Sequence, residues 1–186
     1  MKLPAPKEMF RRRSEESQFD PLMPTTDHTD GGCFLFGSIR PFASLTSFHP
    51  DPVNIFKLWQ TFIDNVHPLT KLLHAPTMQK EILEAISNPS NISRSMEALM
   101  FAIYLAAVIS LDDEECKSKM GGPRSTLVAK YAGLAQQALV RASFLKTFDM
   151  VVLQAFTLFL VRNVFHLLIE RIRKRLGVRL SAYGKS

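Results

Sequence analysis

The side chains that could bind a metal ion are few and widely spaced. The histidines are His28, His49, His67, His74 and His166. None of them stands with a carboxylate or a thiol at the spacing that places zinc ligands on one helix face. His67 and His74 flank a Pro-Leu-Thr sequence, so we interpret both as turn and packing residues. The sequence therefore predicts no metal site.

Two cysteines are present, Cys33 and Cys116, far apart in the sequence, so the chain has no disulfide framework and a reducing cell interior is favoured. Cys116 follows the acidic run Asp112–Glu115, which is expected to raise the pKa of its thiol and to disfavour a nucleophilic role. The run itself lacks the alternating oxygen ligands of a cation-binding loop. We interpret it as the solvated first turn of a helix.

The glycine pairs at 31–32 and 121–122 lack the Lys-Ser/Thr or the third glycine of a phosphate-binding loop. No pairing of a nucleophile with a base is visible elsewhere. The sequence therefore predicts a protein that is not an enzyme and that holds no cofactor.

The basic residues are concentrated in one place. The formal net charge is +6, and the stretch 162–186 accounts for all of it, so a nucleic-acid face across the whole domain is not predicted. The densest part of this tail is a patch formed by Arg171, Arg173, Lys174 and Arg175. Three interpretations stay open: a nuclear-localisation patch, a contact for nucleic acid or anionic lipid, and an out-of-frame remnant without function.

Residues 1–48 are rich in proline and polar residues and predict a mostly disordered arm. Its apolar pieces, Cys33–Phe36 and Phe42–Phe48, are candidates for docking on the body. Regular structure is expected from Asp51, which can cap a helix that has Pro52 in its first turn. Spacings of three and four residues then indicate one apolar helix face, formed by Phe56, Trp59, Phe62, Ile63 and Val66 and ended by Pro68.

Besides the helix that the acidic run opens, four further helices are expected. A short one contains Ile82, Leu83 and Ile86, and a central one, capped by Ser93 or Ser95, is apolar nearly all round from Ala98 to Ile109. Ser125 is expected to cap the next, and Asp149 to open a long last helix. The inward stripe of the helix after Ser125 consists of Leu127, Tyr131, Leu134, Ala135, Ala138 and Leu139. With no strand-like alternation, the chain is predicted to be all-α and built of antiparallel helical hairpins.

Several segments resemble the fungal-specific transcription factor domain, the middle homology region of zinc-cluster regulators. They are His49–Pro52, Phe56–Gln60, Asn65–Thr77, Glu97–Tyr104, Leu139–Leu145 and Leu153–Phe156. The resemblance covers roughly residues 49–161. It implies an all-α regulatory domain, a nuclear location, protein partners (other regulators or a second copy) and control of transcription, with secondary-metabolite pathways as a frequent setting.

Two departures from the family are visible. Two cysteines cannot build the six-cysteine, two-zinc head that reads DNA in this family, so DNA is expected to be reached only indirectly or through another segment. After Val161 the resemblance fades, which suggests an incomplete regulatory domain from a truncated gene model, a retained intron or a degenerate copy. The expected organisation is an arm at 1–48, a partial regulatory domain at 49–161 and a basic tail at 162–186.

An alternative is a small membrane-associated protein. The segment Met150–Ile169 is apolar, has the length of a membrane span and is followed by basic residues. Gln154, Arg162, Asn163 and His166 interrupt it, and a central arginine costs about 2.5–3.5 kcal/mol on insertion. A buried core helix is therefore the favoured interpretation, and a membrane partner is not expected.

Overall fold

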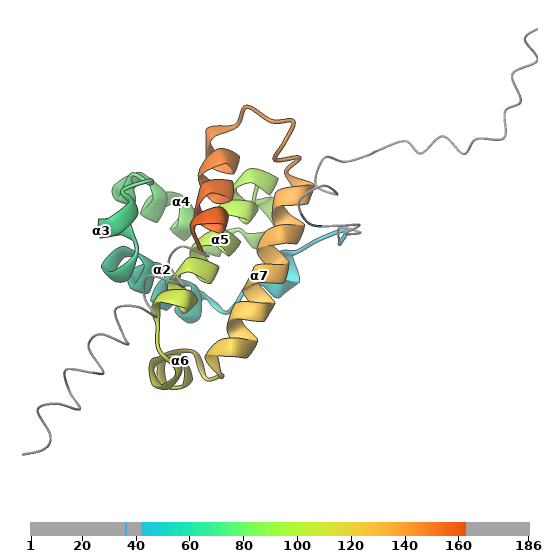
Figure 1. Ribbon diagram of the computed structural model, residues 1–186. Coiled ribbons are helices and arrows are strands. Elements are labelled where there is room, and N and C mark those ends of the chain that lie inside the picture. The colour runs from blue at the N-terminus through green and yellow to red at the C-terminus, as the bar shows by residue number, and fades with distance from the viewer. Residues whose placement is uncertain (1–35, 37–41, 163–186) are drawn as a thin grey trace, which may run out of the picture.

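The computed structural model describes residue 36 and residues 42–162, and this part of the chain is helical with no strand (Figure 1). The elements are η2 (Thr46–Phe48), α2 (Pro52–Asn65), α3 (His67–Thr70), α4 (Ala75–Ser87), η3 (Pro89–Asn91), α5 (Arg94–Ser110), α6 (Asp113–Met120) and α7 (Arg124–Arg141). A last helix covers residues 150–162. The all-α prediction is confirmed.

Helix α5 is the centre of the molecule. Every residue from Met96 to Ile109 is buried, because α2 and α7 pack closely along this helix. In Figure 1, α5 lies in the middle, with α2 and α4 on one side and α7 on the other. Its apolar character all round is what a helix needs when neighbours cover all of its sides. Of the two predicted caps, Ser93 and Ser95, the structure has Ser93, whose side chain accepts a hydrogen bond from the Met96 amide at 3.1 Å.

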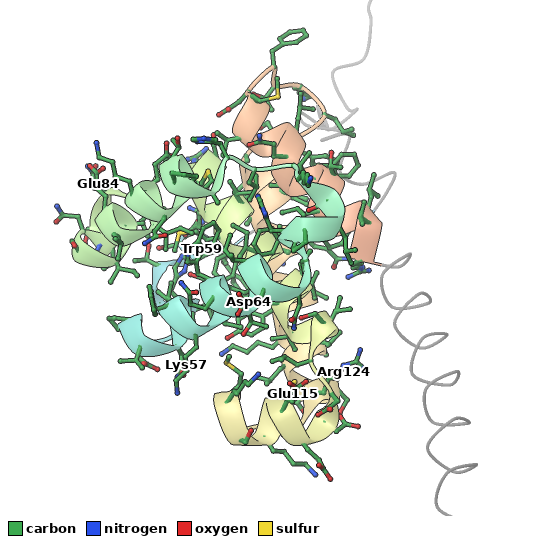
Figure 2. All side chains as sticks on the ribbon, turned by 90° about the vertical axis from the view of Figure 1, so that its left-hand side faces the viewer. Lys57, Trp59, Asp64, Glu84, Glu115 and Arg124 are labelled. Atoms are coloured by element: carbon green, nitrogen blue, oxygen red, sulfur yellow. The ribbon has the colours of Figure 1, made fainter. Side chains whose placement is uncertain are left out.

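Helix α2 begins as the sequence predicts, with the Asp51 carboxylate accepting from the Asn54 amide. Its buried side is rotated from the predicted face and consists of Ile55, Leu58, Trp59, Thr61 and Phe62. Phe56 was expected in the buried stripe, but its side chain is 43% exposed because it lies beside the inward arc rather than on it. Figure 2 shows Trp59 among the helices and Lys57 at the outside.

The end of α2 differs from the prediction. The helix ends at Asn65, and Pro68 does not stop it but lies in the first turn of α3, where its missing N–H needs no partner. In α4 the buried side chains are Met78, Ile82 and Ala85, whereas Leu83 is 47% exposed. Helix α4 ends before Asn88 and Pro89, as predicted.

Helix α6 is a short helix between α5 and α7, and α7 is a long helix that packs along α5. Asp112 and Glu115 form a capping box at the start of α6, so the acidic run does open a helix. Gly121 ends α6 with φ 73°, a conformation that glycine adopts without strain. Helix α7 begins after Pro123 with no side-chain cap, so the prediction that Ser125 caps it is wrong. The predicted inward stripe of α7 is buried from Tyr131 onward.

The last helix starts at Met150, and the Asp149 carboxylate accepts from the Val151 amide at 2.9 Å, as a cap does. One of its sides joins the core, and Gln154 donates to the Leu72 carbonyl at 3.2 Å. Residues 163–169 of the apolar segment lie outside the described part. Within that part, no helix is long and apolar enough to cross a membrane.

Candidate functional site

Residues 42–51, which we call the clamp segment, cross from α7 to the start of α2. The Phe42 amide donates to the Gln137 side chain of α7 at 3.2 Å, and Arg141 donates to the Ala43 carbonyl at 3.2 Å. Leu45 is fully buried in the core. The expectation that the apolar piece Phe42–Phe48 docks on the body is confirmed, and its attachment combines backbone hydrogen bonds with one buried leucine.

Glu97 and Arg141 form a buried ion pair beneath this segment. Glu97 lies in the first turn of α5 and Arg141 is the last residue of α7, and the guanidinium donates to the carboxylate at 2.5 Å. The Glu97 side chain is only 6% exposed. Burial raises the pKa of Glu97, and the charges of Arg141 and Arg94 oppose that rise. The pair therefore ties the start of α5 to the end of α7.

His49 of the clamp segment lies beside this ion pair. Its ring stacks on Phe101 at a centroid distance of 4.5 Å, and Nδ1 shares a hydrogen bond with the Tyr104 hydroxyl at 3.2 Å. Nε2 lies 4.0 Å from the Glu97 carboxylate, which is too long for a hydrogen bond, and it has no other partner. Burial lowers the pKa of His49 from 6.5 to about 4, so the ring is neutral at neutral pH.

The four side chains, His49, Glu97, Tyr104 and Arg141, form what we call the polar buckle. A histidine beside a carboxylate could in principle act as a general base. Here the carboxylate is occupied by Arg141, the imidazole lies flat on Phe101, and the side chains of His49 and Glu97 are 7% and 6% exposed. A substrate has no approach to the ring. The arrangement joins three pieces of backbone and is a structural site.

A cavity of about 200 Å³ lies elsewhere, between α4, η3 and the start of α5. Its lining combines the exposed residues Glu81, Glu84, Asn88 and Asn91 with the buried Ala85 and Met96. Figure 2 shows Glu84 at the outside of the molecule. No residue of the polar buckle lines this cavity, whereas Ser93, a predicted cap of α5, does.

The histidines that flank the Pro-Leu-Thr turn are used locally. His67 Nε2 donates to the Leu73 carbonyl at 2.9 Å, and His74 Nδ1 shares a hydrogen bond of 2.8 Å with Thr77 Oγ1. Both bonds hold the connection between α3 and α4, in agreement with the interpretation as turn residues. No cluster of three or more metal-binding side chains occurs within residues 42–162.

Cys116 is fully buried, with its thiol 3.9 Å from the Val108 carbonyl. Burial is the main cause that raises its pKa, and the acidic run adds to it. The predicted basic patch at Arg171, Arg173, Lys174 and Arg175 lies outside the described residues, as do His28, Cys33 and His166. Their roles stay predictions.

Sequence reasoning missed the polar buckle. Its members come from three segments that are separated by tens of residues, and periodicity within one helix does not predict contacts between such segments. One signal was available: Glu97 is the only charged residue between Met96 and Ile109, in a helix that was predicted to be buried. A carboxylate in that position requires a cation, because an unpaired buried charge is costly.

Comparison with known proteins identifies relatives over most of the chain. It is 42% identical over 180 residues to the aurofusarin cluster transcription factor of Gibberella zeae, a match that covers 93% of this chain and 27% of the relative. It is 41% identical to the transcriptional regulator AacuB of Aspergillus aculeatus, over 81% of this chain and 22% of the relative. A pyriculol/pyriculariol biosynthesis cluster transcription factor of Pyricularia oryzae is 36% identical over 79% of this chain and 19% of the relative.

The match to the Gibberella zeae protein extends beyond residues 49–161. Even if it began at residue 1, a match over 93% of the chain would pass residue 162, so the similarity reaches into both flanking stretches. No family model matches the chain, and no solved structure matches it.

These relatives define the class. The chain is homologous to a segment of fungal transcription factors, and the resemblance to their regulatory region is confirmed. A C6 finger domain transcription factor of Aspergillus niger, 31% identical over 67% of this chain, places the zinc-cluster regulators among the relatives. The chain spans about a quarter of the length of the first two relatives. The named relatives are transcription factors, not enzymes.

Proposed function

We propose that this chain is a regulatory, protein-binding region of a transcription factor that controls a biosynthetic gene cluster. The observation that carries the proposal is the 42% identity over 93% of the chain to a transcription factor named for such a cluster. The buried polar buckle and the fully enclosed α5 support it, because they build a rigid helical scaffold with no substrate access. The chain acts by presenting helix faces to other proteins, and it performs no catalysis.

In this proposal the protein works in the nucleus and reaches DNA through another polypeptide segment or a partner. The basic patch at Arg171, Arg173, Lys174 and Arg175 serves nuclear import. The similarity to the Gibberella zeae protein continues past residue 162. This supports the interpretation that at least the start of the basic tail is homologous sequence rather than an out-of-frame remnant. A fluorescent fusion tests this role: replacing the four basic residues with alanine is expected to shift the protein from the nucleus to the cytoplasm. Unchanged nuclear accumulation would contradict it.

Promoter tethering tests the regulatory role. The chain, fused to an unrelated DNA-binding domain, is expected to change the output of a reporter that carries the matching DNA sites. Leu99→Asp is a folding-deficient control, because it places a charge in the centre of the buried α5. The exposed position Leu69 on α3 provides a matched control, Leu69→Asp, that keeps the fold. The proposal fails if the wild-type fusion, expressed and folded, leaves the reporter unchanged.

A further inference from the structure

The last helix has a second apolar face that points away from the core. Met150, Leu153, Thr157 and Leu160 follow one another at spacings of three, four and three residues, which places them on one side of the helix. All four are exposed, and the three large apolar side chains are 65%, 42% and 50% exposed in that order. The opposite side contributes Val152, Ala155, Leu158 and Phe159 to the core. We call the four exposed residues the outer stripe.

The connection that leads into this helix increases the exposed apolar area. Leu145 is 50% exposed, and Phe148 is 100% exposed two residues before the helix begins. Five of the eleven exposed large apolar side chains of the described part therefore fall within residues 145–160. Scattered exposed apolar residues are ordinary on a protein surface, but a concentration on one helix face and its entry marks an interaction surface.

We propose that the outer stripe is the interface through which two copies of this chain pair, with the two last helices antiparallel. A two-fold interface requires a surface that is complementary to itself. The order of spacings is the same in both directions, so reversing the helix superimposes Met150 on Leu160 and Leu153 on Thr157. The small Thr157 then leaves space for Leu153 of the second copy. Antiparallel helices also place opposite ends of their dipoles side by side.

The available area fits a weak, reversible dimer. A fully exposed phenylalanine offers about 150–250 Å². With the partial exposures of Leu145, Met150, Leu153 and Leu160, the outer stripe and the connection before it offer roughly 500 Å² per copy. A dimer that used both would bury about 1,000 Å², near the lower limit for a specific interface. The outer stripe contains no charged residue, so pairing brings no like charges together. A dissociation constant on the order of 10–100 µM is expected for such an interface.

The other possible occupant is a helix from a longer transcription factor of this class, since the first two relatives have about three quarters of their length outside the matched region. Self-association of the purified chain distinguishes the two, because it requires no other polypeptide. The inference is independent of which genes the protein controls, so failure of the reporter experiment would leave it standing.

Sedimentation velocity of the full 186-residue chain over a range of concentrations tests the pairing. The wild type is expected to convert from monomer to dimer, and Leu153→Glu and Leu160→Glu each to weaken the dimer by at least about tenfold, because pairing would desolvate a carboxylate. Leu69→Glu is the matched control, because Leu69 is 65% exposed but lies on α3. The Leu69→Glu variant should dimerise as the wild type does. Circular dichroism verifies that each variant is folded.

Directed cross-linking tests the antiparallel arrangement. One chain carries Leu153→Cys and the other Thr157→Cys, both in a Cys33→Ser background, while the native Cys116 is buried. Under mild oxidation by diamide, the mixed disulfide between the two variants is expected to form faster than either homodimer.

Any of four results would overturn the proposal: a wild type that stays monomeric at the highest concentration, open-ended aggregation without a dimer, equal weakening by Leu69→Glu, or faster homodimer cross-linking. In the first case the surface would be left to a helix from another polypeptide.

Discussion

Helix α5 and the last helix are similar in sequence and differ in their surroundings. Both are apolar nearly all round, and both lack acidic residues after their first turn. Every residue of α5 from Met96 to Ile109 is buried, whereas the last helix alternates between buried residues and an exposed apolar stripe. A sequence pattern that is apolar all round therefore indicates that every side of the helix can be buried. It does not indicate which sides are covered, or by which neighbouring element.

The two helices also differ in how polar groups attach them. Helix α5 is fixed by the buried ion pair to α7 and by the bond between Tyr104 and His49. Within residues 150–162, the last helix is attached to the rest of the described molecule by a side-chain hydrogen bond from Gln154 to the Leu72 carbonyl. We expect α5 to unfold only with the whole molecule, and the last helix to open more readily.

The largest expected contrast comes from making the same change in both helices. Leu99→Ala in α5 removes a fully buried side chain and is expected to lower the free energy of unfolding by about 3–4 kcal/mol. Leu160→Ala removes a side chain that is 50% exposed and should cost less than about 1 kcal/mol in the monomer. Urea denaturation at low protein concentration measures both. Equal losses would mean that the last helix is as enclosed as α5.

The polar attachments provide the next contrast. Arg141→Met leaves the Glu97 carboxylate buried without a cation and is expected to cost about 3 kcal/mol. Gln154→Leu removes a single neutral hydrogen bond and should cost about 1 kcal/mol.

The double variant Glu97→Gln/Arg141→Met is the control for the ion pair. It should recover most of the loss, because no buried charge remains. If the double variant is as unstable as Arg141→Met, the damage comes from lost packing rather than from an unpaired charge.

The buckle around α5 should also make stability depend on pH. Burial holds the pKa of His49 at about 4 in the folded protein, against 6.5 when unfolded, so the unfolded chain binds more protons between these values. The contribution of His49 to the free energy of unfolding is therefore fully present above pH 6.5. As the pH falls towards 4, this contribution is lost, and the free energy of unfolding is expected to decrease by roughly 2–3 kcal/mol. The raised pKa of Glu97 acts in the opposite direction, because its contribution falls as the pH rises.

Denaturation of the wild type and of His49→Gln at a series of pH values isolates the histidine. Glu97, Tyr104 and Arg141 surround position 49 in both proteins, so the difference between the two curves reports His49 alone. The wild type should lose more stability than the variant between pH 6.5 and 4. Parallel curves would show that the ring is not desolvated by the fold.

The smallest contrast concerns the helix caps. Ser93→Ala at the start of α5 and Asp149→Ala at the start of the last helix each remove one side-chain acceptor, worth about 1 kcal/mol. Hydrogen exchange should show a global loss of protection for Ser93→Ala, but opening confined to residues 150–162 for Asp149→Ala. Global loss in both would mean that the last helix unfolds together with α5.

Local features of the fold could be predicted from the sequence because they depend on neighbours in the chain. The cap at Asp51, one of the two candidate caps of α5 (Ser93) and the helix starts at the acidic run and at Asp149 were correct, since a side-chain oxygen two or three residues before a free amide is a local arrangement. The prediction for Ser125 was wrong because Pro123 already starts α7. A residue type that can cap does not determine which residue begins the helix.

Contacts between distant segments could not be predicted. Phe56 and Leu83 match the apolar period but lie at the edges of their buried faces, and the position of those edges depends on where α5 packs. His49 and Tyr104 are 55 residues apart, and Glu97 and Arg141 are 44 apart. The all-α fold and the central helix therefore followed from the sequence, but the buckle that joins its parts did not.

The clamp segment shortens the reach of whatever polypeptide precedes it. A free, extended chain spans about 3.3–3.6 Å per residue, so the nine steps from residue 42 to 51 would add roughly 30 Å of tether between a preceding module and α2. The hydrogen bonds of Phe42 and Ala43 to Gln137 and Arg141 fix the segment on α7, so it adds no free length to such a tether. A module joined upstream would pivot about the end of α7 rather than about the start of α2, so distances between the two should be measured from residue 42.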